Sequence, residues 1–398
     1  MASTERLYYT DSYLRDFEAA VVDLADEGRR VYLDRTAFYP TSGGQPHDTG
    51  RLDGIQITDV VDEGERIAHL LTQPVRGMKA VGQLDWPRRF DYMQQHSGQH
   101  LLSAVLNDLY GYATVGVHFG PESSTVDLDG PSLNQDQIGK VEDSCNEVVI
   151  ENRPVEVSFE EAEQASGLRK APERTGNLRV VTIRNLDRSA CGGTHVRATG
   201  EIGPILIGKV ERVRKGTRVE FRCGGRAIRR ARADRALLFR LADDFSASTE
   251  ELPALISNLR GEAKESNAAR RNLETQLDGY RARELYLAAA PDATGIRRIV
   301  IRQERGSLEG LRGVAQAFAS LPLAIFVGAT ASPSALVLAA STDSGVDAAG
   351  VLKGLLASVG GRGGGSATLA QGTVPGKAEL EAVVASIGGR VEGLKPKV

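Results

Sequence analysis

The first 85 residues form short apolar runs separated by turn residues. Segments such as 30–34 and 55–61 are rich in β-branched and aromatic side chains. Several short strands of this kind, bounded by turn signals, are typical of a small all-β domain. We therefore predict an N-terminal β-barrel domain over residues 1–85.

The pattern becomes helical after residue 85. Asp85 is a typical helix N-cap, Pro87 suits the first helical turn, and Gly111 supplies a stop. Strand-like and helical segments then alternate irregularly, with strands expected near 115–119, 124–128, 155–159 and 178–183 and a helix near 134–151. This mixture predicts a second, α/β domain over residues 86–226 and places the chain in the α+β class.

Residues 227–291 are charged and have a helical spacing of leucines. We expect two long helices here, arranged as an antiparallel hairpin or arm, with a capping box at 248–251 and an end at Pro291. Residues 292–398 alternate strands and helices around a glycine-rich loop at 360–365, which predicts a small C-terminal α/β domain.

The charge is unevenly distributed along the chain. The whole chain has 49 basic and 52 acidic residues, so net charge alone does not predict nucleic-acid binding. The predicted barrel is acidic, whereas residues 209–240 carry twelve basic side chains and only three acidic ones. A solvated, salt-bridged helix face is the alternative for this basic run, but few local acids are present, and we expect an RNA-backbone surface.

Sequence features also favour a cytoplasmic location. The longest apolar runs, such as 321–327, are far shorter than the roughly 20 residues that span a bilayer. The first six residues lack the features of a secretory signal, and three cysteines are too few for a disulfide framework. We therefore expect a reducing compartment and no membrane span.

Two short motifs have the spacing of metal ligands. His96 and His100 are one helical turn apart, so both imidazoles can project from one face about 5 to 6 Å apart. Cys191 and His195 flank a segment with two glycines, which permit positive φ angles and a tight turn that can bring the thiolate and the imidazole to one point. A lone histidine is more often a core or surface residue, but these four together predict one shared ion, and a thiolate with imidazoles selects Zn²⁺.

The same residues carry a resemblance to a known family. Residues 38–50, 96–102, 191–196 and 199–203 resemble the editing domain of alanyl-tRNA synthetase and its free-standing relatives, the AlaX proteins. The helical stretch after Gly225 and residues 360–372 are similar to the C-terminal domain of that synthetase. The chain leaves no room for an ATP-using aminoacylation domain, so the resemblance is to the long form of AlaX.

This resemblance implies a function. Long AlaX proteins act in trans as aminoacyl-tRNA deacylases on tRNA(Ala) mischarged with serine or glycine, without ATP. The four ligand positions match His96, His100, Cys191 and His195 of this chain. Two roles stay open for zinc: the ion anchors the pocket and positions the terminal adenosine, or one ligand such as His195 yields to water.

The glycine-rich loop at 41–45 is the second candidate for the active site. Its composition alone favours a plain turn. The resemblance implies catalytic-site roles for Thr41 and Gln45, with Thr41 matching the position that hydrogen-bonds the serine hydroxyl. A buried hydroxyl there would be unsatisfied beside the methyl group of alanine, which explains how serine is distinguished.

Contacts with tRNA are expected from two regions. The basic run contributes Arg212, Arg214, Lys215 and Arg218, and the glycine-rich stretch contributes Gly361, Gly363 and Gly364. The resemblance also implies that the C-terminal region contacts tRNA or mediates a homodimer. Two alternatives stay open: a zinc-stabilised tRNA-binding protein without catalysis, and an enzyme that edits another mischarged tRNA.

Overall fold

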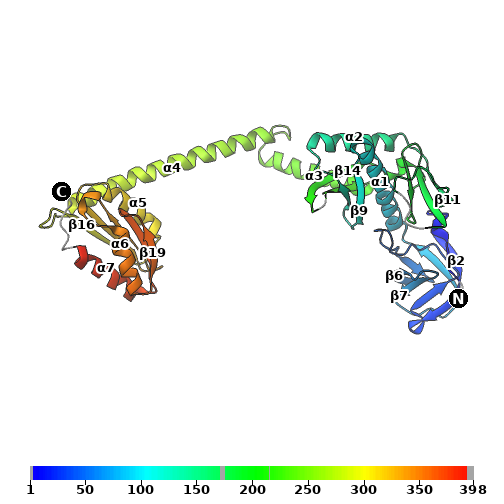
Figure 1. The fold of residues 1–398 in the computed structure, drawn as a ribbon, viewed down its shortest axis with the longest axis horizontal. Helices are drawn as coiled ribbons and strands as arrows, with labels where there is room; N and C mark the ends of the chain where they lie inside the picture. Colours follow the sequence, from blue (N-terminus) through cyan, green and yellow to red (C-terminus); the bar gives the residue numbers. More distant parts are fainter. Residues whose placement is uncertain (1–2, 171–174, 215, 392–398) are drawn as a thin grey trace. The chain divides into compact units, whose positions relative to one another are not determined.

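The computed structural model describes residues 3–170, 175–214 and 216–391. Contacts within the chain define two compact units, Met1–Thr249 and Glu250–Val398. The first unit is coloured blue to green in Figure 1, and the second is coloured from yellow-green to red. The four-part division expected from the sequence is finer than these two units and stays a prediction.

The N-terminal part of the first unit is a closed six-stranded barrel, as predicted. Its apolar interior includes Val31, Leu33, Phe38 and Leu52, which are fully buried. A parallel pair of two-residue strands, β1 and β4, lies outside the barrel. The elements of this region are β1 (Glu5–Arg6), η1 (Leu7–Tyr9), β2 (Asp16–Ala25), η2 (Asp26–Gly28), β3 (Arg30–Leu33), β4 (Arg35–Thr36), β5 (Gly50–Leu52), β6 (Ile55–Asp62), β7 (Ile67–Leu71) and β8 (Lys79–Leu84).

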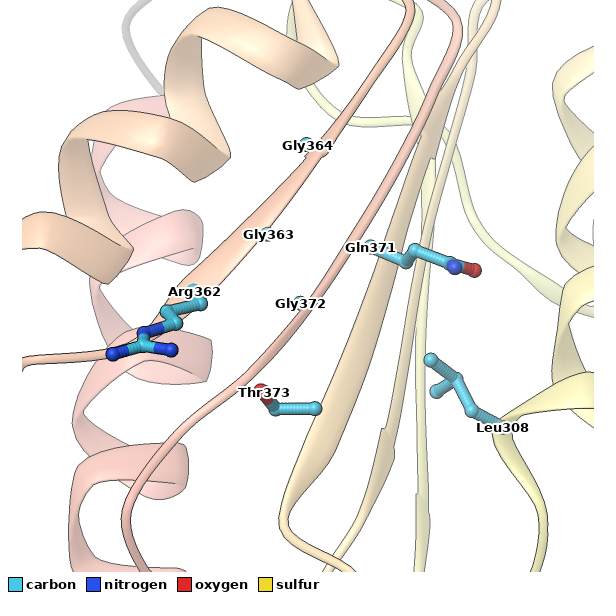
Figure 2. A pocket seen from close by; sticks show the side chains of 7 residues that line it. All are labelled: Leu308, Arg362, Gly363, Gly364, Gln371, Gly372 and Thr373. Atoms are coloured by element: carbon cyan, nitrogen blue, oxygen red, sulfur yellow. The ribbon is translucent and has the colours of Figure 1, made fainter.

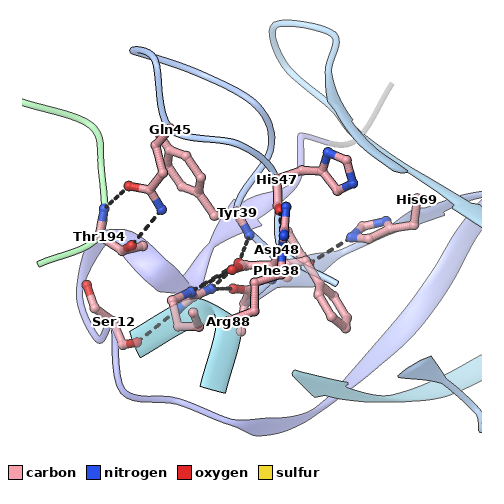
Figure 3. Close-up of polar contacts among 12 residues, drawn as sticks. Ser12, Phe38, Tyr39, Gln45, His47, Asp48, His69, Arg88 and Thr194 are labelled. Atoms are coloured by element: carbon pink, nitrogen blue, oxygen red, sulfur yellow. Dashed lines mark hydrogen bonds and ion pairs between the residues drawn. The ribbon is translucent and has the colours of Figure 1, made fainter. Parts of the chain in front are cut away.

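One histidine is sealed inside the barrel. His69 on β7 is fully buried, and its Nδ1 lies 3.1 Å from the carbonyl oxygen of Val31. Because a carbonyl only accepts, Nδ1 carries the proton, and Nε2 accepts from the hydroxyl of Thr36 at 2.8 Å. Figure 3 shows His69 among the polar contacts of this region. Burial lowers the pKa of His69 to about 4. The solitary His69 is thus a neutral core residue, as expected.

This burial predicts an acid-dependent loss of stability. Between pH 6.5 and about 4 the unfolded chain binds a proton at His69 and the folded chain does not, so the free energy of unfolding falls as pH falls. The full shift corresponds to about 3 kcal/mol. Urea unfolding at pH 7 and pH 4.5, with a chelator present throughout, should show a steeper pH dependence for the native protein than for His69→Gln. Identical slopes would contradict the assignment.

Helix α1 (Trp86–Tyr110) follows the barrel and confirms the predicted caps. The carboxylate of Asp85 accepts from the backbone N–H of Arg88, and Gly111 ends the helix in the left-handed conformation. The middle of α1 is buried, with Met93, Leu101 and Leu102 in the largest apolar core of this unit. The helix therefore presents the residues between these positions to the protein interior.

The rest of the first unit packs around α1 with two sheets. One sheet has the order β14-β15-β10-β9 and the other β11-β12-β13, and all their pairings are antiparallel. Helix α2 begins with a capping box formed by Asn134 and Gln137. The elements are β9 (Ala113–Phe119), β10 (Ser124–Asp129), α2 (Gln135–Ile150), β11 (Val155–Glu161), β12 (Asn177–Ile183), β13 (Asp187–Ala190), η3 (Thr199–Ile202), β14 (Ile205–Val213), β15 (Gly216–Cys223) and α3 (Gly225–Asp244).

The second unit is an α/β module, as expected. Its sheet has the order β16-β17-β18-β20-β19, in which β16 and β17 are parallel and the other pairs antiparallel. One apolar core contains residues of α6 and α7, and another contains residues of α4 and α5. The elements are α4 (Leu252–Ala288), β16 (Arg297–Gln303), α5 (Leu308–Ala319), β17 (Ala324–Thr330), β18 (Ala335–Ala340), η4 (Thr342–Ser344), α6 (Ala348–Ser358), β19 (Arg362–Gly365), β20 (Leu369–Thr373) and α7 (Lys377–Val391).

One local expectation is wrong, and another stays a prediction. Helix α4 begins at Leu252, directly after the stretch 248–251 for which a capping box is predicted. The glycine-rich stretch is not a loop, because residues 362–365 form the edge strand β19 and pair with β20. Long-range pairing overrides the low strand propensity of glycine here.

No helix in the described ranges is both long enough and apolar enough to cross a membrane.

Candidate metal centre

Four side chains from two distant segments converge in the first unit. His96 and His100 come from the buried face of α1, and Cys191 and His195 come from the segment that follows β13. One potential ligand atom from each residue lies within 4.8 Å of those of the other three. The rings of His96 and His100 are 5.3 Å apart, as the helical spacing predicts. The sequence thus identified the cluster correctly.

The distances fit a tetrahedral ion. The Cys191 sulfur lies 3.4 Å from Nε2 of His96 and 3.3 Å from Nε2 of His195. In a tetrahedral zinc site, metal–nitrogen bonds of about 2.0 Å and a metal–sulfur bond of about 2.3 Å require nitrogen–sulfur separations of about 3.5 Å. The donor set of one sulfur and three imidazole nitrogens therefore fits a bound metal ion.

The opposite ring nitrogens are all held by hydrogen bonds. Nδ1 of His96 lies 2.8 Å from Oε1 of Gln45, and Nδ1 of His100 lies 3.0 Å from Oδ2 of Asp187. Nδ1 of His195 lies 3.1 Å from the Ser97 hydroxyl. Such partners fix the ring orientation and leave the Nε2 lone pair for the ion. All three imidazoles are therefore oriented before a metal binds.

Asp187 is the most strongly connected of these partners. It is buried at the start of β13, and Nε of Arg169 donates to its second oxygen at 2.7 Å. Burial raises the pKa of Asp187, but His100 and Arg169 outweigh this effect and hold it at about 2. Burial also raises the pKa of the Cys191 thiol, but the imidazoles of His96 and His195 hold it well below its usual value. Both groups are thus anionic, as metal binding needs.

Gln45 connects the barrel loop to the metal centre. Its amide nitrogen donates to the Thr194 hydroxyl at 2.8 Å, and its oxygen accepts from Thr194 N–H at 3.3 Å in addition to its contact with His96. Figure 3 shows Gln45 turned toward Thr194, while His47 points away from it. The side chain of Gln45 is buried, and both its amide nitrogen and its amide oxygen form hydrogen bonds. Gln45 is therefore well placed to orient the ring of His96. Its predicted catalytic role stays a prediction.

The paired glycines do not use the positive φ angles that glycine permits. Cys191 and His195 nevertheless converge, as predicted. Gly193 is required for space instead, because a Cβ atom there would stand 2.2 Å from Cε1 of His96. The small residue lets the backbone after Cys191 pass directly against a ligand ring.

Thr41 lies at the surface of the loop next to Gln45. Its hydroxyl accepts from His47 N–H at 3.1 Å, and its side chain is exposed rather than buried as expected. Gly44 in the same loop runs close to β9, since a Cβ there would stand 3.0 Å from the carbonyl of Val117. The loop therefore lies between the barrel and β9, and Thr41 faces solvent.

The basic run has more acidic partners than expected. Arg218 makes two hydrogen bonds to Asp127, and Arg226 is buried against Asp91 of α1. These acids are remote in sequence, so a local count of charges could not find them. Arg212 and Arg214 are exposed, and Lys215 lies outside the described residues.

Sequence reasoning missed three residues that support the centre. Ser97 lies inside the first motif, and Asp187 stands four residues before Cys191, where a carboxylate near ligands could have been noticed. Arg169 comes from a segment whose sequence has no metal-site signature, and only the fold reveals its contact.

Comparison with known proteins agrees with this geometry. Residues 178–219 match the model of the threonyl and alanyl tRNA synthetase second additional domain. The chain is 31% identical over 396 residues to the alanyl-tRNA editing protein AlaX-L of Pyrococcus horikoshii, covering 94% of this chain and 96% of that protein.

Two further relatives extend the comparison. The alanine–tRNA ligase of Methanoregula boonei is 34% identical over 394 residues, covering 94% of this chain and 42% of the ligase. The alanyl-tRNA editing protein Aarsd1 of Bos taurus is 35% identical over 241 residues, covering 55% of this chain and 54% of that protein. The chain thus spans less than half of the ligase and nearly all of AlaX-L. Similarity over the full length of an editing protein, joined to the convergent histidine and cysteine cluster, shows that this chain belongs to the family of alanyl-tRNA editing proteins, homologues of the editing region of alanyl-tRNA synthetase.

Proposed function

We propose that this chain is a deacylase that acts in trans on tRNA(Ala) mischarged with serine or glycine. The observation that carries the proposal is the four-ligand centre connected through Gln45 to the glycine-rich loop. The substrate ester is already activated, so hydrolysis needs a positioned water, a proton acceptor and stabilisation of the oxyanion, and no ATP. Family membership supports tRNA(Ala) as the partner.

We infer that the metal is Zn²⁺, held by His96, His100, Cys191 and His195. One thiolate and three imidazoles form a donor set typical of zinc. A bound zinc ion would supply positive charge that polarises or positions the polar groups of the acceptor end. The protein's own contribution is to hold the rings through Gln45, Ser97 and Asp187, and to keep the 41–45 loop beside the centre.

We propose that Thr41 recognises the serine hydroxyl. Its exposed hydroxyl stands in the same loop as Gln45, which contacts the ligand His96. A bound aminoacyl group would bury this hydroxyl, and only serine could then satisfy it.

Thr41→Val should therefore affect the two substrates differently. We expect kcat/KM on seryl-tRNA(Ala) to fall about 10-fold or more, because one buried hydrogen bond is lost, and kcat/KM on glycyl-tRNA(Ala) to change little. Parallel deacylation assays on the two charged tRNAs measure this difference. Thr41→Ser, which keeps the hydroxyl, is the matched control and should retain the serine preference. An equal loss on both tRNAs would show that Thr41 does not recognise the serine hydroxyl.

A single assay separates an enzyme from a zinc-stabilised binding protein. Purified protein is incubated with seryl-tRNA(Ala), alanyl-tRNA(Ala) and a mischarged tRNA of another identity, and ester loss is followed. Selective turnover of seryl-tRNA(Ala) supports the proposal. Binding without turnover would favour the structural alternative, and turnover of the other mischarged tRNA would favour a different editing specificity.

We propose that tRNA contacts come from the β14–β15 hairpin and from strand β19. Arg212 and Arg214 are exposed at the end of that hairpin, and Arg218 follows on β15. A cavity of about 260 Å³ in the second unit is lined by Arg362, Gly363, Gly364 and β20 residues (Figure 2). Three successive exposed glycines beside Arg362 support close approach of a phosphate backbone.

The glycines of this edge are not equivalent. Cβ atoms on Gly361 and Gly363 would stand 2.9 and 2.6 Å from the side chain of Leu356 on α6, whereas a Cβ on Gly364 would meet nothing within 4 Å. The same Cβ atoms would stand 2.7 and 2.3 Å from the carbonyl oxygens of Thr373 and Gln371 on β20. Gly361 and Gly363 thus make room for both the helix and the neighbouring strand, whereas Gly364 has no such neighbour.

Gly363→Ala should accordingly affect mainly stability, and Gly364→Ala should affect mainly tRNA binding. We expect Gly363→Ala to destabilise the protein by about 1 to 3 kcal/mol, the usual range for overpacking. Gly364→Ala should leave the thermal midpoint unchanged and weaken tRNA binding. Thermal unfolding and filter binding of tRNA(Ala) measure the two effects. A Gly363→Ala variant as stable as the native protein would contradict the packing argument.

We propose that the second unit also mediates a homodimer. Leu273, Leu277 and Tyr280 on α4 follow helical spacing and are 64%, 49% and 68% exposed. Such a stripe supports pairing with another helix. Sedimentation equilibrium of the full chain tests this assembly.

A further inference from the structure

Arg179 of β12 borders the metal centre. Its side chain is only 8% exposed, Nε donates to the carbonyl of Tyr9 at 2.9 Å, and Nη1 donates to the carbonyl of Cys191 at 2.7 Å. The backbone N–H of Cys191 donates in turn to the carbonyl of Arg179 at 3.0 Å. The guanidinium is therefore fixed directly beside the backbone of a metal ligand.

The third nitrogen of this guanidinium has no partner. Nη2 is closed to solvent, and no hydrogen bond to it is found within the described ranges. Arg89 in the same unit shows the usual solution for a buried arginine, since its Nε donates to Asp48 at 2.9 Å and its Nη1 to the carbonyl of Ser12 at 2.8 Å. Leaving a buried donor unpaired costs free energy, so an orphaned donor at a functional site points to an absent partner.

The positive charge of Arg179 is also not neutralised by a carboxylate. Over the part of the chain that the structure describes, no Asp or Glu oxygen lies within 4.0 Å of it. The guanidinium therefore favours an anionic ligand at this side of the centre.

We propose that Nη2 of Arg179 is the hydrogen-bond donor for an anionic oxygen of the substrate at the metal centre. This inference rests on the proposed deacylase function. Two substrate oxygens have the required chemistry. One is the ester carbonyl oxygen, which becomes negative when the water oxygen bonds to the carbonyl carbon, before the carbon–oxygen bond to the ribose breaks and the ribose oxygen leaves with a proton. The other is an oxygen of the terminal phosphodiester.

Tyr9 lies next to Arg179 at this side of the centre. The ring centroid of Tyr9 lies 5.6 Å from Cζ of Arg179, and the tyrosine is partly exposed. Its hydroxyl would stand 3.6 Å from a Cβ on Gly192. The ring is therefore close to both the guanidinium and the Cys191 segment.

The test compares two substitutions with a matched control. Arg179→Gln removes the charge, and Arg179→Lys keeps the charge but cannot hold both carbonyls and still donate. Arg184→Lys is the control, because this arginine follows β12 in the chain, is exposed and pairs with Glu156 at 2.6 Å. Metal content and thermal midpoint are measured first. Then kcat and KM are measured on seryl-tRNA(Ala) and on 3′-O-seryladenosine, which has no phosphate.

We expect both Arg179 variants to keep one metal per chain, to lower the thermal midpoint because the carbonyls of Tyr9 and Cys191 lose a donor, and to lose about 100-fold in hydrolysis, as when one oxyanion donor is removed. If the ligand oxygen is the oxyanion, kcat falls on both substrates. If it is the phosphate, KM rises for seryl-tRNA(Ala) and the seryladenosine kinetics are unchanged. Arg184→Lys should behave as the native protein.

Three results would overturn the inference or separate it from the proposed function. Native kinetics in both variants would show that Nη2 contacts no substrate oxygen. Loss of metal or of folding in both variants, in step with activity, would assign Arg179 to the structure alone. If the native protein hydrolyses neither ester, the proposed function fails, and calorimetric titration with adenosine 5′-monophosphate then decides: binding lost in Arg179→Gln supports the anion site, and equal binding refutes it.

Discussion

Replacing Cys191 with alanine is expected to abolish metal binding and ester hydrolysis together. The sulfur lies 3.3 to 3.4 Å from two of the three imidazole nitrogens, so its loss removes one corner of the tetrahedron and the negative charge that offsets the ion. Changes to outer hydrogen-bond partners alone cost 10- to 100-fold, so loss of a ligand should exceed about 100-fold. Metal analysis of the purified protein and deacylation of seryl-tRNA(Ala) measure the two losses.

Cys145→Ala is the matched control for this substitution. Cys145 is fully buried in the apolar core, and burial raises the pKa of its thiol, so it behaves as a small apolar residue. We expect this variant to lose about 1 kcal/mol of stability and to keep both metal and activity. A Cys191→Ala protein that deacylates at the native rate without metal would refute the role of the centre in the reaction.

Asp187→Asn should weaken metal binding by about 10- to 100-fold without removing a ligand. The carboxylate accepts from Nδ1 of His100 at 3.0 Å and from Nε of Arg169 at 2.7 Å, and the neutral amide reduces the basicity of His100 and leaves Arg169 without its counter-charge. Competition against a chelator of known affinity measures the change. Because the four ligands remain, saturating metal should restore most of the activity.

Glu160→Gln provides the comparison for Asp187→Asn. Glu160 lies in the same three-stranded sheet and forms two hydrogen bonds with Arg188, both 2.7 Å, but neither residue contacts the ligands. The metal affinity of the Glu160→Gln variant should equal that of the native protein. Equal metal affinities for the Asp187→Asn variant and the native protein would show that Asp187 does not orient His100.

Local sequence signals were reliable where one element decides the outcome. Asp85 and Gly111 bound helix α1, and the four-residue spacing of His96 and His100 places both rings on one buried face. These features depend on dihedral preferences and helical geometry within a few residues, which sequence expresses directly. The loop predicted at 360–365 was wrong for the same reason. Residues 362–365 form strand β19 because they pair with β20, and their own glycines do not indicate a strand.

The sequence by itself determined the barrel, the capped helix and the four residues of the candidate metal centre, since each follows from local composition and spacing. Only the tertiary structure decided how the ligands are held and charged. Gln45 reaches His96 across 51 positions, Asp187 reaches His100 across 87, and Arg179 meets the carbonyl of Tyr9 across 170. Such contacts arise when distant segments pack together, and the free energy of burying and pairing polar groups, which no local pattern records, selects them.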